Sequence, residues 1–199
     1  MMKNLYRSIM MTFSLCAFLA LGYVLILWVF AQFFSPNGGN TETIELNGRV
    51  VGAANIGQNF TNDKYFWGRP SAVAYNASGS GGSNKATNNP DYLKDVENRI
   101  ESFLKAHPYL KKSEVPSEMV TASGSGLDPD ISPRGAYVQV GRVAKARDIP
   151  EAVVRKIVND NVQAPFLGLF GTKKVNVLKL NIALDSLDKN LESPREDAK

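Results

Sequence analysis

The sequence predicts an α+β protein, with a single N-terminal transmembrane helix followed by one mixed α/β extracytoplasmic domain. Three observations predict this class. Residues 9–34 carry no charged side chain, residues 35–199 suffice for one domain, and that second part mixes helical apolar spacing with short apolar runs. The expected parts are a cytoplasmic N-terminus at 1–8, the transmembrane helix at 9–34, a linker at 35–43, an extracytoplasmic accessory domain at 44–192 and a frayed tail at 193–199.

The apolar run is long enough to cross a bilayer, because about 20 apolar residues suffice for a spanning helix. A cleaved secretory signal is the alternative, but its apolar region is about 7 to 15 residues long and ends at small residues. Here the run is longer and ends in Ala-Gln-Phe-Phe at 31–34, without a small-x-small cleavage site. We therefore expect a retained anchor, in which Cys16 is a small apolar filler.

The charges on either side of the run predict its orientation. Lys3 and Arg7 precede it without any acidic residue, whereas Glu42, Glu45 and only Arg49 follow within about twenty residues. Basic residues stay on the cytoplasmic side of a span. We expect the domain to lie on the outside of the membrane.

After the turn-rich linker at 35–43, two cap signals organise the domain. Asn89 and Pro90 form a helix cap followed by a first-turn proline, and the apolar spacing behind them predicts a helix over 90–106. Ser132 and Pro133 repeat that signal and predict a helix to about Arg147.

The C-terminal third is less uniform. Pro150 opens a further helix whose apolar face carries Val153, Val154, Ile157 and Val158. From Val175 the pattern begins as a strand, and over 178–188 alternation and helical spacing fit equally well, so both alternatives stay open.

Composition excludes several function classes. One Cys and one His among 199 residues are too few for a disulfide framework or a structural zinc site, so no metal is expected. The net charge of +4 includes Lys3 and Arg7 before the apolar run, so 21 basic and 19 acidic residues remain. That nearly even balance does not indicate the basic surface that binds nucleic acid.

Two runs of Ala-Ser-Gly-Ser-Gly, at 77–81 and 122–126, lie in long polar loops that could share one face. The first fails as a phosphate-binding P-loop, because Asn84 stands where the second glycine belongs and Ala86 where the hydroxyl belongs.

A membrane-anchored periplasmic serine hydrolase is the rival enzyme class. It would use Ser123 or Ser125 with His107 and Asp128. His107 is more simply explained as the cap at the end of the 90–106 helix, and neither serine lies in a Gly-x-Ser-x-Gly elbow.

Several segments carry a resemblance to a known family. They are, in chain order, Ile-Gly-Gln at 56–58 with Phe60, Tyr-Phe-Trp-Gly-Arg-Pro-Ser-Ala at 65–72, Ser-Gly-Gly-Ser-Asn at 80–84, Thr-Ala-Ser-Gly-Ser-Gly-Leu-Asp-Pro at 121–129, Ile-Ser-Pro at 131–133, Arg-Val-Ala-Lys-Ala-Arg at 142–147 and Val-Asn-Val-Leu at 175–178. With these segments the sequence closely resembles the C subunit of the Kdp potassium-transporting P-type ATPase. The chain departs from the family at Tyr23-Val24, where a Tyr-Pro element is usual, and at Asp130 and Asn161, where His is common.

The resemblance implies a complex in which a channel-like A subunit binds potassium, a B subunit hydrolyses ATP, and a small fourth peptide joins them. It implies no catalytic centre in the C subunit itself, which is viewed as an assembly factor or catalytic chaperone that raises the ATP affinity of the pump subunit. Because ATP is cytoplasmic and the domain is expected outside, any effect on ATP has to travel through the anchor or across subunits.

The most distinctive residues lie in polar loops, which carry binding more often than packing. On that basis we expect Arg69, Asn84, Asp128 and Gln139 to contact the partner subunits.

Overall fold

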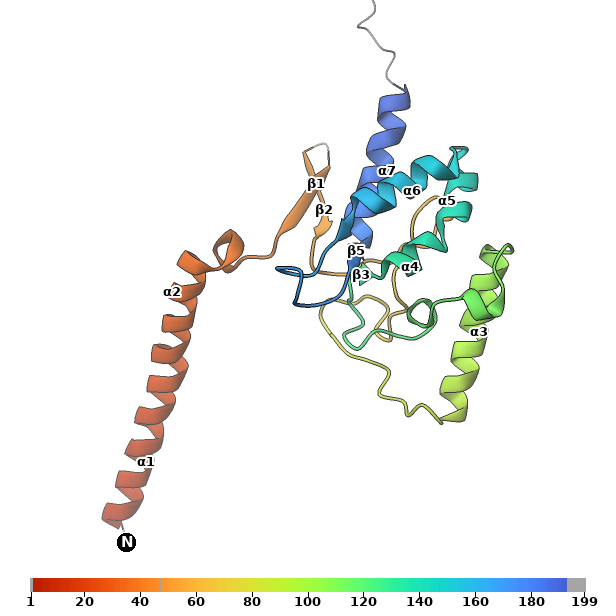
Figure 1. Ribbon diagram of the computed structural model, residues 1–199. Coiled ribbons are helices and arrows are strands. Elements are labelled where there is room, and N and C mark those ends of the chain that lie inside the picture. Colours follow the sequence, from red (N-terminus) through yellow and green to blue (C-terminus); the bar gives the residue numbers. More distant parts are fainter. Residues whose placement is uncertain (1, 47, 193–199) are drawn as a thin grey trace, which may run out of the picture. The chain divides into compact units, whose positions relative to one another are not determined.

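The computed structural model describes residues 2–46 and 48–192, so the tail expected at 193–199 lies outside the described residues. Contacts divide the chain into two compact units, Met1–Glu42 and Thr43–Lys199. The elements in chain order (Figure 1) are α1 (Met2–Ala17), η1 (Phe18–Tyr23), α2 (Val24–Phe34), η2 (Pro36–Gly39), β1 (Thr43–Leu46), β2 (Arg49–Ala53), α3 (Pro90–Ala106), η3 (Lys112–Glu114), η4 (Ser117–Met119), β3 (Asp130–Ile131), α4 (Pro133–Tyr137), α5 (Val140–Arg147), α6 (Glu151–Asp160), β4 (Val162–Gln163), β5 (Lys174–Asn176) and α7 (Val177–Glu192).

The first unit is dominated by one continuous helix over Met2–Phe34, long and apolar enough to cross a membrane. None of the described side chains of α1 or α2 is buried within the protein, as expected of a helix whose solvent is lipid. The predicted span at 9–34 therefore lies within a helix that starts earlier, at Met2. A π-helical turn, η1, ends at Tyr23, where the Tyr-Pro element of the resembling family is replaced.

The second unit mixes helices with two small antiparallel sheets, which confirms the mixed α and β class. Strands β1 and β2 form a hairpin, and the other sheet has the order β3-β5-β4. In that sheet Val175 of the central strand pairs with Ile131 on one side and Val162 on the other. Val175 is fully buried, so the middle of the sheet lies in the core.

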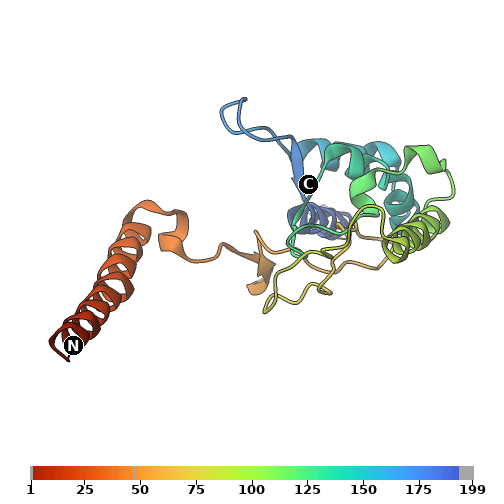
Figure 2. The same cartoon turned by 90° about the horizontal axis from the view of Figure 1, so that it is seen from below.

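Helices α4 to α7 pack around this sheet, with α6 in contact with α4, α5 and α7 (Figures 1 and 2). The apolar face predicted for α6 is confirmed, because Val154 and Val158 are fully buried. The fully buried apolar side chains of the unit include Phe66, Ala136, Val143, Leu180 and Leu184.

Helix α3 covers the residues predicted from the cap signal. The Asn89 side chain accepts a hydrogen bond from the Tyr92 backbone N–H at 3.1 Å, and Pro90 occupies the first turn. His107 closes the helix as its C-terminal cap, as the sequence suggested.

The single helix predicted from Pro133 to Arg147 is wrong, because the chain forms two helices there. Ser132 caps α4 as expected, accepting from the Gly135 N–H at 3.1 Å. The chain then breaks at Val138 and Gln139, and α5 begins at Val140. The break does not fall at Gly135 or Gly141, although glycine weakens a helix, but where Gln139 turns its side chain into the interior.

The ambiguity after Val175 is resolved into a strand followed by a helix. Strand β5 ends at Asn176, whose side-chain oxygen accepts from the Lys179 N–H at 3.0 Å, the pattern of a helix cap. Helix α7 then buries Leu180 and Leu184, which are four residues apart on one face.

Candidate functional site

The two glycine-serine loops lie against each other. The Gly81 N–H donates to the Ser125 carbonyl at 2.8 Å, the Ser80 hydroxyl donates to the same carbonyl at 3.0 Å, and the Ser71 hydroxyl donates to the Gly126 carbonyl at 2.7 Å. We call the surface formed by residues 68–84 and 121–130 the loop face. The expectation that both repeated runs share one face is confirmed.

Glycine is required where backbones approach most closely. A Cβ atom on Gly126, which has φ +70°, would lie 2.7 Å from the Gly81 carbonyl oxygen. A Cβ atom on Gly57 would lie 2.5 Å from the Asp128 carbonyl oxygen. The positions of the two loops are therefore set by backbone contact rather than by long side chains.

An ion pair joins the two halves of the loop face. Arg69 Nη1 lies 3.0 Å from Asp128 Oδ2, and the two side chains are 26% and 29% exposed. The other Asp128 oxygen accepts from the Asp130 N–H at 3.1 Å. Among the described residues the buried Nε of Arg69 has no hydrogen-bond partner, so this guanidinium is only partly satisfied.

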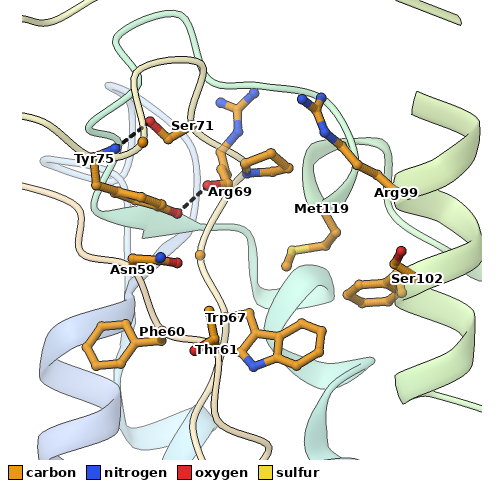
Figure 3. A pocket seen from close by; sticks show the side chains of 14 residues that line it. Asn59, Phe60, Thr61, Trp67, Arg69, Ser71, Tyr75, Arg99, Ser102 and Met119 are labelled. Atoms are coloured by element: carbon orange, nitrogen blue, oxygen red, sulfur yellow. Dashed lines mark hydrogen bonds between the residues drawn. The ribbon is translucent and has the colours of Figure 1, made fainter. Parts of the chain in front are cut away.

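Beside this pair the surface is hollowed by a cavity of about 420 Å³ between the loop face and α3. Phe60 and Trp67 line one part of it, and Figure 3 shows the guanidinium groups of Arg69 and Arg99 together at the opposite rim. Arg69 is already paired with Asp128, and Arg99 donates to the Val120 carbonyl at 3.3 Å, so the hollow combines an apolar floor with polar groups at its edge.

Three non-glycine residues of the loop face have positive φ, a region that costs side chains about 1–2 kcal/mol. They are Ala74 at 52°, Tyr75 at 58° and Asn84 at 51°. The first two are held by the Tyr75 N–H, which donates to the Ser71 hydroxyl at 2.9 Å, and by the Tyr75 hydroxyl, which donates to the Arg69 carbonyl (Figure 3). Strained residues concentrate at functional sites, and these three lie around one hollow or on the loop beside it.

The segment that leads into the loop face is fixed from beneath by two amide side chains. Gln139 accepts from the Trp67 N–H at 2.8 Å and donates to the Trp67 carbonyl at 3.1 Å. Asn181 does the same for Phe66, at 2.8 and 3.0 Å. Within the described part of the chain, this segment pairs with no neighbouring strand. The two amide side chains supply the hydrogen bonds that such a strand would make, so the buried backbone groups of Phe66 and Trp67 are paired.

A buried cation completes this support. Arg142 Nε donates to His107 Nε2 at 2.9 Å, Nη2 donates to the Tyr65 carbonyl at 3.0 Å, and the guanidinium lies 4.1 Å from the Trp67 ring centroid. Burial lowers the pKa of Arg142 to about 10, which leaves it charged at neutral pH. Burial is also the main reason why the pKa of His107 falls to about 4, with the nearby Arg142 cation lowering it further.

Comparison with known proteins identifies the family. The family described as "KdpC: K+-transporting ATPase, c chain" matches residues 5–186. The chain belongs to the KdpC family.

Individual KdpC relatives are similar over nearly their whole length. The potassium-transporting ATPase KdpC subunit of Phocaeicola vulgatus is 61% identical over 92% of this chain and 98% of its own. The KdpC subunit of Bacteroides fragilis is 58% identical over 94% and 98%, and that of Flavobacterium psychrophilum is 55% identical over 94% and 100%. The resemblance drawn from the sequence motifs is confirmed.

The structure pairs two of the four contact residues expected in this KdpC chain and leaves a third exposed at the end of one loop. Arg69 and Asp128 form the ion pair, and exposed Asn84 lies in the same loop face. Gln139 is fully buried under Trp67, so its side chain fixes the segment before Arg69 and has no surface of its own.

The hydrolase alternative for this KdpC chain has no support. The Ser123 hydroxyl accepts from the Gly126 N–H at 2.9 Å, and the Ser125 hydroxyl accepts from the Leu127 N–H at 3.1 Å. His107 is buried, with Nδ1 2.8 Å from the Phe103 carbonyl and Nε2 bound to Arg142, so both ring nitrogens are occupied. Asp128 is engaged by Arg69 instead of orienting a histidine.

Three glycine N–H groups in and beside the KdpC loop face are already paired. The N–H groups of Gly57, Gly81 and Gly126 donate to the Leu127 carbonyl, the Ser125 carbonyl and the Ser123 hydroxyl, and are not free to cradle a phosphate. Within residues 2–46 and 48–192 no three His, Cys, Asp or Glu side chains are grouped as metal ligands.

Sequence reasoning missed two polar residues of the KdpC hollow, Tyr75 and Arg99. Tyr75 adopts a left-handed backbone conformation, which a tyrosine in the sequence does not predict. Arg99 lies four residues before Phe103 on α3, and that spacing is a usable signal, because it puts both on the face that lines the hollow.

Proposed function

We propose that this chain is a non-catalytic accessory subunit of a high-affinity ATP-driven potassium uptake complex. It assembles and stabilises the complex, and it acts as a catalytic chaperone that raises the ATP affinity of the pump subunit. The observation that carries the proposal is the loop face, in which strained backbone, a partly exposed ion pair and an aromatic hollow occur together.

The chemistry of the loop face suits a protein partner. Arg69 and Asp128 present opposite charges at a surface that remains partly solvated, and exposed Asn84 adds an amide to the same loop face. Such polar groups fix the register of two protein surfaces, and a buried arginine or aromatic anchor supplies the affinity. We assign the contact to the channel-like A subunit, beside the potassium entrance.

The proposed placement is a single-pass protein of a bacterial inner membrane, with Lys3 and Arg7 in the cytoplasm and the second unit in the periplasm. The apolar helix then packs against lipid and against spans of the A and B subunits, and the small fourth peptide belongs to the same complex. Since ATP is cytoplasmic and the second unit is proposed to be periplasmic, the effect on ATP affinity is assigned to coupling through the helix and the partner subunits.

Exchanging the charges of the ion pair tests the contact. Arg69→Asp and Asp128→Arg should each lower co-purification of the channel and pump subunits roughly thirtyfold or more, since an interfacial charge contact is worth about 2 kcal/mol or more. The double exchange rebuilds the pair within the chain. It should restore thermal stability without restoring co-purification or potassium uptake.

A matched control is Lys156→Ala, which removes a surface ion pair with Asp160 on α6, outside the loop face. It should leave assembly unchanged, because exposed helix pairs contribute only about 0.3–0.5 kcal/mol. Full recovery of assembly by the double exchange would show that Arg69 and Asp128 serve only the chain's own fold.

A further inference from the structure

The segment between β4 and β5 ends in a group of exposed apolar side chains. Phe166, Leu167, Leu169 and Phe170 are between 64% and 81% exposed. Both views show this segment as a blue loop that extends away from the helices of its unit (Figures 1 and 2). Four large apolar side chains exposed side by side are uncommon on a protein surface that faces only water.

The backbone holds this group in a defined turn. The Leu169 N–H donates to the Phe166 carbonyl at 3.1 Å, and Phe166 and Phe170 pair as in a narrow hairpin, with the Phe166 N–H 2.9 Å from the Phe170 carbonyl. Leu167 has φ 53° and Gly168 has φ 73°, as in a type I′ turn.

Leucine is a poor choice at the first central position of such a turn, where Asn, Asp or Gly is preferred. At Leu167 the chain therefore accepts an unfavourable backbone as well as an apolar side chain that is 73% exposed. Neither cost is offset by packing within the described chain. This combination indicates a surface that is covered in the working protein.

The tip has a natural apolar environment within reach, because the chain is anchored by its own helix. Residues 35–42, which join Phe34 to β1, can extend at most about 28 Å. A domain of this size is roughly 40 Å across. The second unit must therefore keep one of its faces close to the bilayer surface.

The charges that follow the tip agree with a lipid surface. Lys173 and Lys174 are exposed directly after the tip, and the Lys174 ammonium lies 2.6 Å from an Asp130 carboxylate oxygen. Aromatic and leucine side chains at the apex with the exposed Lys173 behind them match the apolar and polar layers of a membrane interface.

We propose that residues 166–170 form a second membrane contact, in which Phe166, Leu167, Leu169 and Phe170 enter the interfacial layer of the bilayer that holds the chain's own helix. With two attachment points the second unit cannot rotate freely on its linker. The contact thus sets which way the loop face points, whatever partner that face binds.

Depth-dependent quenching tests the contact in the full chain, reconstituted alone in vesicles of phosphatidylethanolamine and phosphatidylglycerol. In a Cys16→Ser background, which removes the single native cysteine, Leu167→Cys carries an environment-sensitive fluorophore. Its emission should shift to shorter wavelength and be quenched by lipids with a spin label near the headgroup. The matched control is Ser78→Cys, an exposed position in a polar loop, which should show neither effect.

Adding Leu169→Asp to the Leu167→Cys chain should lower the quenched fraction roughly tenfold or more, since one buried leucine contributes that much to insertion. Leu169 is exposed, so unfolding temperatures should not change and misfolding is separated from loss of insertion. Equal quenching at positions 167 and 78 would overturn the proposal. So would quenching that disappears when the channel and pump subunits are co-reconstituted, because a protein surface would then cover the tip.

Discussion

At the scale of single residues, a few buried polar side chains do what regular sheet pairing does elsewhere. Gln139 and Asn181 each bind both backbone groups of one residue in the 65–67 segment. Arg142 joins the same segment to His107 and stacks on Trp67. Because all these groups are buried, losing one partner leaves the others unsatisfied, which costs about 1–3 kcal/mol for each group.

His107 provides a pH-dependent prediction at this scale. Its pKa is about 4 in the folded chain and 6.5 as the ordinary value, so between these limits the unfolded chain binds more protons. Stability should therefore be complete above about pH 6.5 and decline as the pH falls towards 4, by about 3 kcal/mol from this residue. Urea unfolding at pH 7 and pH 5 measures the decline, and His107→Gln should reduce it.

The same residue can be observed directly, because it is the single histidine of the chain. Arg142 Nε can only donate, so His107 Nε2 must accept and the proton must sit on Nδ1, facing the Phe103 carbonyl. Nitrogen NMR of the labelled full chain in detergent should show this neutral tautomer at pH 6. Titration at an ordinary pKa near 6.5 would contradict the buried placement.

At the scale of elements, short helices and strands end at residues that contact distant parts of the chain. The chain breaks between α4 and α5 at the residue that reaches Trp67, and β5 turns into α7 at Asn176, which also donates to the Ala54 carbonyl at 2.7 Å. The loops follow the same rule, since glycine stands where two backbones touch. Tertiary contacts therefore set the ends of these helices and strands more than local conformational preference does.

Two glycines outside the left-handed region test this at matched positions. Gly57→Ala places a methyl group 2.5 Å from the Asp128 carbonyl oxygen, whereas Gly79→Ala meets nothing within 4 Å. Gly57→Ala should lower the free energy of unfolding by on the order of 2 kcal/mol and weaken subunit assembly by displacing the Asp128 segment. Gly79→Ala should change neither, and equal urea midpoints for the two variants would refute the close contact.

At the scale of the whole molecule, the two units meet different solvents. The Met2–Phe34 helix leaves its apolar side chains exposed, while the second unit has a core of its own that starts at Ala54. A helix of that length and composition is suited to cross a membrane, whereas the second unit carries the loop face. The proposed function needs both units, because the anchor keeps the loop face at the membrane.

Labelling of intact cells tests the proposed orientation. A Ser78→Cys chain in the Cys16→Ser background exposes one thiol in the second unit. A membrane-impermeant maleimide should label it in intact spheroplasts to the same extent as in lysed cells, because Lys3 and Arg7 hold the N-terminus in the cytoplasm. Labelling that requires lysis would reverse the topology.

By itself the sequence determined the features that rest on neighbouring residues. The charge-free run at 9–34 specified the apolar helix, and the Asn89-Pro90 cap specified α3, because helix signals act within one or two turns. The loop segments that carry Arg69, Asn84 and Asp128 were also recognised, together with the family.

Only the tertiary structure decided what depends on partners distant in the chain. The break before α5, the burial of Gln139 and the start of α7 all follow contacts to residues 54–67. The aromatic hollow likewise needs α3 and the loop face to meet. The physical reason is that a buried polar group needs a hydrogen-bond partner, which the fold can bring from any part of the chain. The spacing of residues along the sequence does not show which distant residue that partner is.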